Sequence, residues 1–367
     1  MKHHKDEGLP ESALKVNAGV EQPPIINAKG AALFKRSKKA ELTVAEYVAG
    51  IKSGSRAVLS KAITVVESAL PAHTAVAQQV IAECLPLSGN SVRIGITGVP
   101  GVGKSTFIES FGKYLTGLGH KVAILAIDPS SNKSKGSILG DKTRMELLSS
   151  DPNAFIRPSP SSGTLGGVAR KTHETIILCE ASGYDVILIE TVGVGQSEVL
   201  VHSMVDFFLL LMLAGAGDEL QGIKRGIMEM ADGVFITKDD GDNVNRVQLA
   251  LAEVRNALHF LAPSESGWTP PAASGSAVTG KGITDIWEMI SAYVRLTKSN
   301  SYFDKKRTEQ KISVMRREIE QGLLDEFYYN PLMKSELSKF EKELQNGKIS
   351  SYIAAQEIIG KFKNNRK

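Results

Sequence analysis

One stretch of the chain decides the fold: Val92-Arg-Ile-Gly-Ile-Thr-Gly-Val-Pro-Gly-Val-Gly-Lys-Ser105. Its apolar first half predicts a buried strand, and its second half has the spacing of a Walker A loop. The glycines let successive backbone N–H groups point at phosphate oxygens, and the following helix adds its positive dipole end. The loop's lysine reaches the β- and γ-phosphates, and the serine hydroxyl binds magnesium. We therefore expect a nucleotide to contact Gly98, Val99, Pro100, Gly101, Val102, Gly103, Lys104, Ser105 and Thr106.

Around this stretch, β-rich apolar runs alternate with helical patterns. That alternation is typical of an α/β fold with a mainly parallel sheet and helices on both faces. We expect residues 1–90 to form a polar start and a small helical extension, residues 91–297 a P-loop domain, and residues 298–367 a helical arm. Ligands in such folds bind at the carboxyl ends of the strands. The expected strands are Val92–Thr97, Lys121–Asp128, Ala154–Arg157, Asp185–Thr191, Phe207–Leu213, Val234–Thr237 and Ala272–Ala277.

A second motif, Asp185-Val-Ile-Leu-Ile-Glu-Thr-Val-Gly193, is an apolar run that ends in an acidic residue. Glu190 stands where many P-loop proteins carry an aspartate that faces magnesium. Gly193 would let a backbone N–H approach the γ-phosphate. The alternative is an acidic strand end that is merely solvated, but the order of the two motifs favours the magnesium site.

Two further carboxylates flank a Gly- and Ser-rich stretch. Asp128 ends an expected strand, and Asp141 follows the stretch Pro129 to Gly140. A long polar loop of this kind at the carboxyl edge suits a segment that senses magnesium and the γ-phosphate. The alternatives are a turn at Asp128 and a helix cap at Asp141, and the sequence leaves open which carboxylate contacts the metal directly.

The stretch Val234-Phe-Ile-Thr-Lys-Asp-Asp240 ends in a form of the guanine-reading motif. Asp240 can accept hydrogen bonds from both N1–H and the 2-amino group of guanine, and adenine offers no such pair. Lys238 would lie along the base, and Ser276-Ala277-Val278 fits the loop that closes over the guanine O6. Thr237 replaces the usual asparagine and lacks its loop-bridging amide, so we expect weaker nucleotide binding, with ATP as the alternative ligand.

The composition excludes few classes of protein. The chain of 367 residues carries 44 basic and 40 acidic side chains, a net charge of +4, so nothing favours nucleic acid or an anionic membrane as a partner. The first residues lack the apolar core of a signal peptide, and the most apolar run, Phe207–Leu213, is too short to span a bilayer. We therefore expect a cytoplasmic protein.

Beyond the single motifs, long runs of residues resemble the MeaB/ArgK-type GTPases, from about Leu42 to Trp287. Those proteins are GTP-dependent chaperones of methylmalonyl-CoA mutase and related cobalamin-dependent acyl-CoA mutases. The resemblance implies a protein that binds GTP or GDP with Mg²⁺, forms a homodimer, and loads and protects a mutase's cofactor. It rests on Asp128-Pro-Ser-Ser131, Gly136-Ser-Ile-Leu-Gly-Asp-Lys-Thr-Arg-Met145, Arg157-Pro-Ser-Pro-Ser-Ser-Gly-Thr-Leu-Gly-Gly167, Glu190-Thr-Val-Gly-Val-Gly-Gln-Ser-Glu198 and Gly217-Asp-Glu-Leu-Gln-Gly-Ile-Lys-Arg-Gly226.

The same resemblance implies that Gly217–Gly226 is a further switch, with Lys224 among the catalytic residues. Without it, this stretch predicts only the start of an amphipathic helix. No glutamine follows Gly193 directly, because Val194 stands there and Gln196 is the nearest. Since a glutamine at that position orients the attacking water in small GTPases, we expect slow hydrolysis by the isolated protein. The predicted catalytic residues are Lys104, Asp141, Glu190, Gln196 and Lys224.

Two other functions fit parts of the pattern. A P-loop kinase would transfer the γ-phosphate to a small molecule or protein, but the sequence shows no distinct acceptor pocket or base. A metal-delivery GTPase would carry a His-rich tract or paired cysteines. The seven histidines are scattered and the two cysteines lie far apart, which favours the mutase chaperone.

Overall fold

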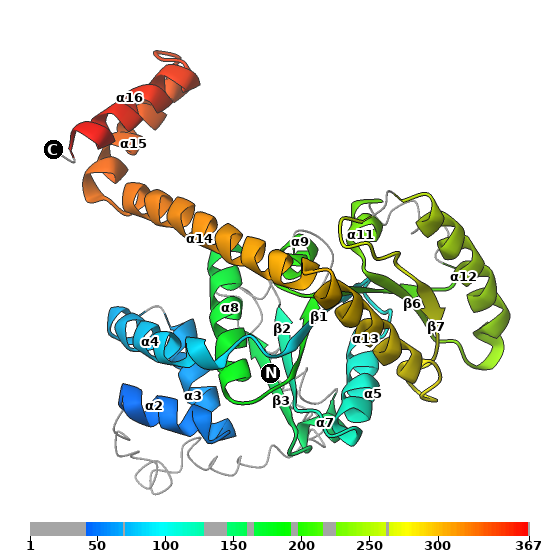
Figure 1. The fold of residues 1–367 in the computed structure, drawn as a ribbon. Coiled ribbons are helices and arrows are strands. Elements are labelled where there is room, and N and C mark those ends of the chain that lie inside the picture. The colour runs from blue at the N-terminus through cyan, green and yellow to red at the C-terminus, as the bar shows by residue number, and fades with distance from the viewer. Residues whose placement is uncertain are drawn as a thin grey trace, which may run out of the picture. The chain divides into compact units, whose positions relative to one another are not determined.

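Seven parallel strands form one sheet in the computed structural model of this chain (Figure 1). The strand order is β3-β2-β4-β1-β5-β6-β7, so β1 lies in the middle and the strands that follow it are added on both sides. The structure describes residues 42–68, 70–127, 145–159, 165–191, 197–215, 225–261 and 264–365. The strands are β1 Val92–Gly98, β2 Val122–Ile127, β3 Ala154–Ser159, β4 Val186–Thr191, β5 Phe207–Leu213, β6 Gly233–Thr237 and β7 Ala272–Ser274.

The α/β prediction is confirmed, and all seven expected strands are present. The last one is shorter than expected, because the chain leaves the sheet after Ser274. Ser276 N–H then donates to the Lys281 carbonyl (3.0 Å) instead of to a neighbouring strand. The division of the chain into three regions stays a prediction.

Helices cover both faces of the sheet (Figure 1). Side chains alternate along each strand, so Ile94 and Ile96 of β1 face α5 and α13, whereas Leu210 and Met212 of β5 pack with α12 on the other face. The described helices that connect the strands or follow the last one are α5 Lys104–Gly117, α7 Glu146–Ser149, α8 Leu165–Ala181, α9 Ser197–His202, α11 Arg225–Met230, η3 Gly241–Asn243, α12 Val244–His259 and α13 Ile283–Ser299.

The predicted N-terminal extension is helical and packs on α8. Its longer apolar positions, such as Ile51, Leu59 and Ile63, are fully buried between the helices. The Ser55 hydroxyl caps the second helix by accepting from Val58 N–H. The elements are α2 Val44–Lys52, α3 Arg56–Glu67, α4 Pro71–Cys84 and η1 Leu85–Leu87.

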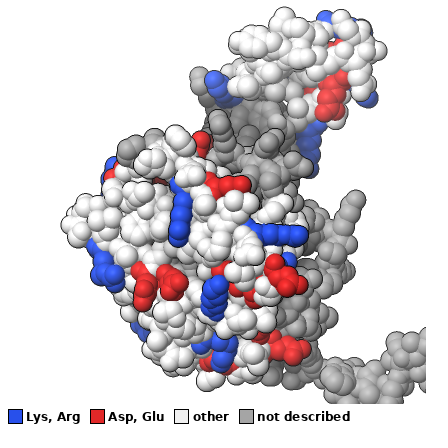
Figure 2. Space-filling model, turned by 90° about the vertical axis from the view of Figure 1, so that its right-hand side faces the viewer, with Lys and Arg blue, Asp and Glu red and all other residues white. Residues whose placement is uncertain are grey.

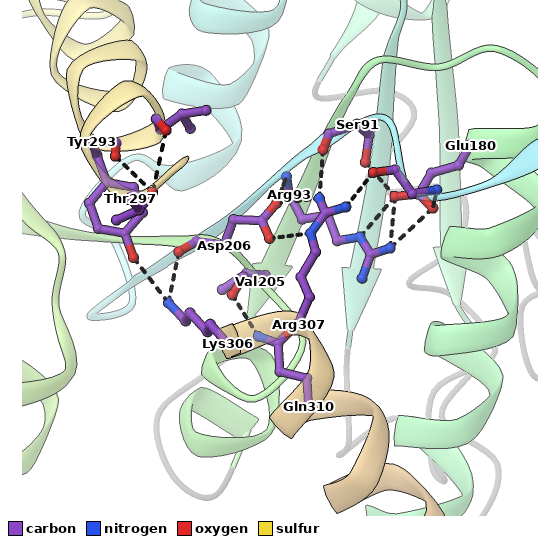
Figure 3. Close-up of polar contacts among 12 residues, drawn as sticks. Ser91, Arg93, Glu180, Val205, Asp206, Tyr293, Thr297, Lys306, Arg307 and Gln310 are labelled. Carbon is purple, nitrogen blue, oxygen red and sulfur yellow. Dashed lines mark hydrogen bonds and ion pairs between the residues drawn. The ribbon is translucent and has the colours of Figure 1, made fainter. Parts of the chain in front are cut away.

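Three helices form the C-terminal region: α14 Tyr302–Tyr328, α15 Pro331–Gln345 and α16 Ser351–Asn364. Buried polar contacts attach the first turns of α14 to the amino ends of the strands (Figure 3). The Arg307 guanidinium forms a two-point ion pair with Asp206, with Nε–Oδ1 2.8 Å and Nη2–Oδ2 2.7 Å. Lys306 Nζ donates to the Asp206 carbonyl (2.7 Å), and Gln310 Nε2 donates to the Val205 carbonyl (2.8 Å).

Charges of both signs are mixed on the face drawn in Figure 2, on the side where α12 lies. Basic and acidic side chains are interspersed there, and neither sign forms a large continuous patch. Within the described residues, no helix has the length and apolar character needed to cross a bilayer.

Candidate nucleotide-binding site

The predicted phosphate loop connects the end of β1 to the start of α5. A Cβ atom on Gly98 would lie 2.5 Å from the Leu211 carbonyl oxygen of β5, so only glycine fits there. Gly103, the residue before α5, has a left-handed backbone with φ 96° that favours glycine. Val102 is buried, whereas Pro100 and Gly101 are exposed. The loop is therefore held by its ends and by the side chains of Val102, which is buried, and Val99, which packs partly against the same core.

Lys104 opens α5 and turns back over the loop. Its Nζ donates to the carbonyls of Gly98 (2.8 Å) and Val99 (3.3 Å). Burial lowers the pKa of Lys104 from its ordinary value, and the nearby carboxylates of Glu190 and Glu198 oppose that effect. The lysine thus lies in an acidic setting at the carboxyl edge of the sheet.

Glu190 lies at the carboxyl end of β4, where it is paired in register with Ile96 of β1. Its side chain is buried, and Ser105 is half-buried in the first turn of α5. A carboxylate and a hydroxyl are oxygen ligands of the kind that Mg²⁺ prefers. Among the described residues, no group of three or more His, Cys, Asp or Glu side chains could hold a metal by itself.

Several predicted site residues lie outside the described residues. They are Asp128, Asp141, Gly193, Gln196 and Lys224. Their proposed roles stay predictions, as does the switch at Gly217–Gly226.

The predicted base-reading segment is hydrogen-bonded to the phosphate loop. Thr237 Oγ1 donates to the Val102 carbonyl (2.8 Å) across 135 positions of sequence. Thr237 lacks the amide of the usual asparagine, but its hydroxyl provides a link between the two loops. The expected weaker nucleotide binding stays a prediction. Lys238, whose φ is 61°, donates from Nζ to the Gly101 carbonyl (3.0 Å).

A third loop joins the same cluster. The Ser276 hydroxyl donates to Asp240 Oδ2 and accepts from the backbone N–H groups of Val278 (3.2 Å) and Thr279 (3.3 Å). Ala277 is half-buried between them, whereas Val278 is exposed. The residues predicted to read the phosphates and the base are therefore brought together at one edge of the sheet.

Two buried acidic residues were not predicted as site residues. Glu198 begins α9 and is 1% exposed, close enough to Lys104 to affect its pKa. Asp239 is also 1% exposed and forms an ion pair with Lys281, with Nζ–Oδ2 2.9 Å. Their positions in sequence, one at a helix start after Gly193 and one beside Asp240, were the only available signals.

Comparison with known proteins relates this whole region to one family. A family model described as "Methylmalonyl Co-A mutase-associated GTPase MeaB" matches residues 59–331. The chain belongs to the MeaB family of GTPases. The match includes β1 to β7 and every described residue of the predicted site.

Relatives of this MeaB-family chain include GTPase ArgK of Escherichia coli (strain K12). It is 46% identical over 290 residues, which cover 79% of this chain and 88% of ArgK. The Mus musculus protein "Methylmalonic aciduria type A homolog, mitochondrial" is 44% identical over 339 residues, covering 89% of this chain and 81% of the relative. The solved structure titled "Crystal structure of LAO/AO transport system kinase" has a TM-score of 0.71 and 36% identity, covering 87% of this chain and 97% of its own.

These findings make the chain a P-loop GTPase. Membership of a GTPase family implies that the chain binds a guanine nucleotide. That the nucleotide binds at the edge where Lys104, Thr237 and Asp240 lie stays a prediction. The individual roles of the site residues remain predictions.

Proposed function

We propose that this GTPase is a cytoplasmic chaperone of a cobalamin-dependent acyl-CoA mutase such as methylmalonyl-CoA mutase. It would use GTP hydrolysis to assist cofactor loading, protection and reactivation of that enzyme. The observation that carries the proposal is the family match over residues 59–331, whose description names a mutase-associated GTPase. The 44% identity to a relative named for methylmalonic aciduria supports it.

In the proposed site, Mg²⁺ would be held by Ser105 and Glu190, with Asp128 or Asp141 as a further ligand. The bound metal would neutralise charge on the β- and γ-phosphates. Lys104 would exchange its bonds to the Gly98 and Val99 carbonyls for bonds to phosphate oxygens. Its position at the helix start supports this role, since the ammonium and the helix dipole then act on the same anion.

Asp240 and the loop at Ser276-Ala277-Val278 would select guanine. We expect GTP and GDP to bind with magnesium and ATP much more weakly. Asp240→Asn should weaken GDP binding about ten- to a hundredfold, because an amide cannot accept from both guanine donors. Titration calorimetry checks this, and equal affinity of the wild type for ATP and GTP would contradict guanine selection.

We further propose a homodimer that forms through the C-terminal helices. The apolar stripe Ile312, Met315, Ile319 and Leu323 on α14 is 42–55% exposed at helical spacing. It continues into an apolar groove of about 730 Å³ between α14, α15 and α16. A second copy of the chain, carrying the same stripe, is a self-complementary partner for such a surface.

The dimer test must keep the first turns of α14, because Arg307 pairs with the buried Asp206. Ile319→Glu is therefore a better test than removal of the arm. We expect it to convert a dimer into a folded monomer that still binds GDP, as measured by light scattering at micromolar concentration. An exposed position off the stripe, Lys311→Glu, serves as the control. A wild-type monomer would overturn the proposal.

Client dependence tests the chaperone role directly. A purified mutase is inactivated during turnover and then incubated with this protein and GTP, with GDP, or without nucleotide. We expect recovery only with GTP, together with an acceleration of hydrolysis that reaches about 10³–10⁵-fold when a missing catalytic group is supplied. Fast hydrolysis that no mutase changes would contradict it. Transfer of the γ-phosphate to another molecule, without phosphate release, would instead support the kinase alternative.

A further inference from the structure

Asp239 is a buried carboxylate next to the predicted guanine reader Asp240. Its Oδ2 accepts from the Ser274 hydroxyl (2.9 Å) and lies 2.9 Å from Lys281 Nζ. Its backbone N–H donates to the Gly275 carbonyl (3.0 Å). All three partners belong to the segment from the end of β7 to the start of α13, so within the described part of the chain Asp239 is bonded to that one segment.

That loop is closed on itself. Ser276 N–H donates to the Lys281 carbonyl (3.0 Å), and Gly280 N–H donates back to the Ser276 carbonyl (2.9 Å). A Cβ atom on Gly275 would lie 2.1 Å from the Lys281 carbonyl oxygen, so the two ends of the loop are in tight contact. Anything that holds Lys281 therefore holds Ser276 as well.

The two adjacent acidic residues attach this loop at different points. Asp240 binds it at Ser276, near its start, and Asp239 binds it at Lys281, near its end. Asp239 Oδ1 is buried and has no hydrogen-bond partner among the described residues. The contacts of Oδ2 with Lys281 and Ser274 are thus the main compensation for burying the charge, and loss of Lys281 would leave it poorly satisfied.

We propose that Asp239 is a positioning residue for guanine selectivity. Through Lys281 and Ser274 it fixes the loop whose backbone N–H at Ala277 would meet the guanine O6, while the Val278 N–H stays bound to the Ser276 hydroxyl. A loop that is already ordered loses little conformational entropy when the base binds. Its ordering should therefore change the affinity for the base and leave the contacts with the phosphates unaffected. This inference rests on the proposed guanine site.

The test compares three diphosphates by titration calorimetry with magnesium: guanosine, inosine and adenosine diphosphate. Inosine keeps the 6-oxo group of guanine and lacks its 2-amino group. Asp239→Asn should weaken guanosine and inosine diphosphate equally, by about tenfold, with adenosine diphosphate unchanged. Asp240→Asn should instead reduce the ratio of guanosine to inosine affinity, because the 2-amino contact is lost.

Lys281 provides a second route that does not alter the buried carboxylate. Its side chain is 52% exposed, so Lys281→Met should fold and reproduce the loss, and Lys281→Arg should restore affinity. Asp242→Asn, an exposed aspartate in the same segment, is the matched control and should bind like the wild type.

Wild-type affinity for guanosine diphosphate in both Asp239→Asn and Lys281→Met would overturn the inference. An equal loss for all three diphosphates would also overturn it, since that outcome indicates general destabilisation. If the wild type binds guanosine and adenosine diphosphate equally, the guanine site itself fails, which is a separate result.

Discussion

The two edges of the sheet use charged side chains in opposite ways. At the carboxyl edge, the ammonium groups of Lys104 and Lys238 donate to backbone carbonyls of the phosphate loop. At the amino edge, buried charges pair with one another (Figure 3). There Arg307 binds Asp206, and a second guanidinium, Arg93, binds Glu180 through Nε at 2.9 Å and Nη2 at 3.0 Å.

This difference suits the lysines at the carboxyl edge to ligand binding and the ion pairs at the amino edge to stabilising the fold. A lysine on a backbone carbonyl can exchange that partner for a phosphate oxygen without leaving a buried charge unpaired. A buried guanidinium–carboxylate pair cannot exchange partners, because removal of either member leaves the other as a buried charge without compensation for its lost hydration. We therefore expect changes at the amino edge to affect folding and changes at the carboxyl edge to affect nucleotide chemistry.

The largest effect should follow from Arg307→Met at the amino edge. The variant leaves Asp206 buried without its cation, which should lower the free energy of unfolding by about 3–5 kcal/mol. Chemical denaturation measures this, and the affinity of the folded fraction for guanosine diphosphate should stay near that of the wild type. Lys305→Met is the control, since its ion pair with Glu265 is exposed and screened by water and should contribute little to stability.

A double variant sharpens this result. Adding Asp206→Asn to Arg307→Met removes the orphaned charge, so part of the lost stability should return. If the single variant is as stable as the wild type, the amino-edge pair does not hold the arm and the contrast between the two edges fails.

At the carboxyl edge, Lys104→Ala should slow single-turnover GTP hydrolysis by at least about 10²–10³-fold, because it removes a preorganised cation from the phosphates. Its effect on the melting temperature should be small, since the hydrogen bonds of this ammonium to described residues go to the loop carbonyls of Gly98 and Val99. Lys121→Ala, at an exposed lysine, should hydrolyse GTP normally. A Lys104→Ala protein with a much lower melting temperature but the wild-type hydrolysis rate would contradict the proposed difference between the two edges.

The smallest effect concerns His202 at the end of α9, whose ring packs edge-on against Phe208. Burial, with a smaller effect from Lys306, lowers the pKa of His202 to about 4. The unfolded chain takes up this proton below about pH 6.5, whereas the folded chain does so only near pH 4. Stability due to the neutral ring is therefore present above pH 6.5 and lost as the pH falls toward 4.

The variant His202→Phe removes this proton uptake. Its unfolding free energy should fall less steeply between pH 6.5 and 4 than that of the wild type, by up to about 1.4 kcal/mol per pH unit. Equilibrium unfolding at several pH values measures the two slopes. Equal slopes would show that the ring is already accessible to water in the folded protein.

Local sequence patterns were sufficient for the strands, the phosphate loop and the order of motifs. Each depends on consecutive residues: an apolar run specifies a buried parallel strand, and the glycine spacing before Lys104 specifies a loop followed by a helix. The parallel sheet then brings strand ends together, so the sequence alone assigns Glu190 and Thr237 to the carboxyl edge.

Only the tertiary structure decided which side chains meet. Arg307 and Asp206 are 101 positions apart, and Thr237 reaches Val102 across 135. Apart from its place beside Asp240, nothing in the local sequence distinguishes Asp239 from a solvated aspartate. Its role depends on Lys281, which a tight loop brings back to the end of β6. Such pairs depend on which distant segments come together in the folded chain, and short-range patterns in sequence do not specify those contacts.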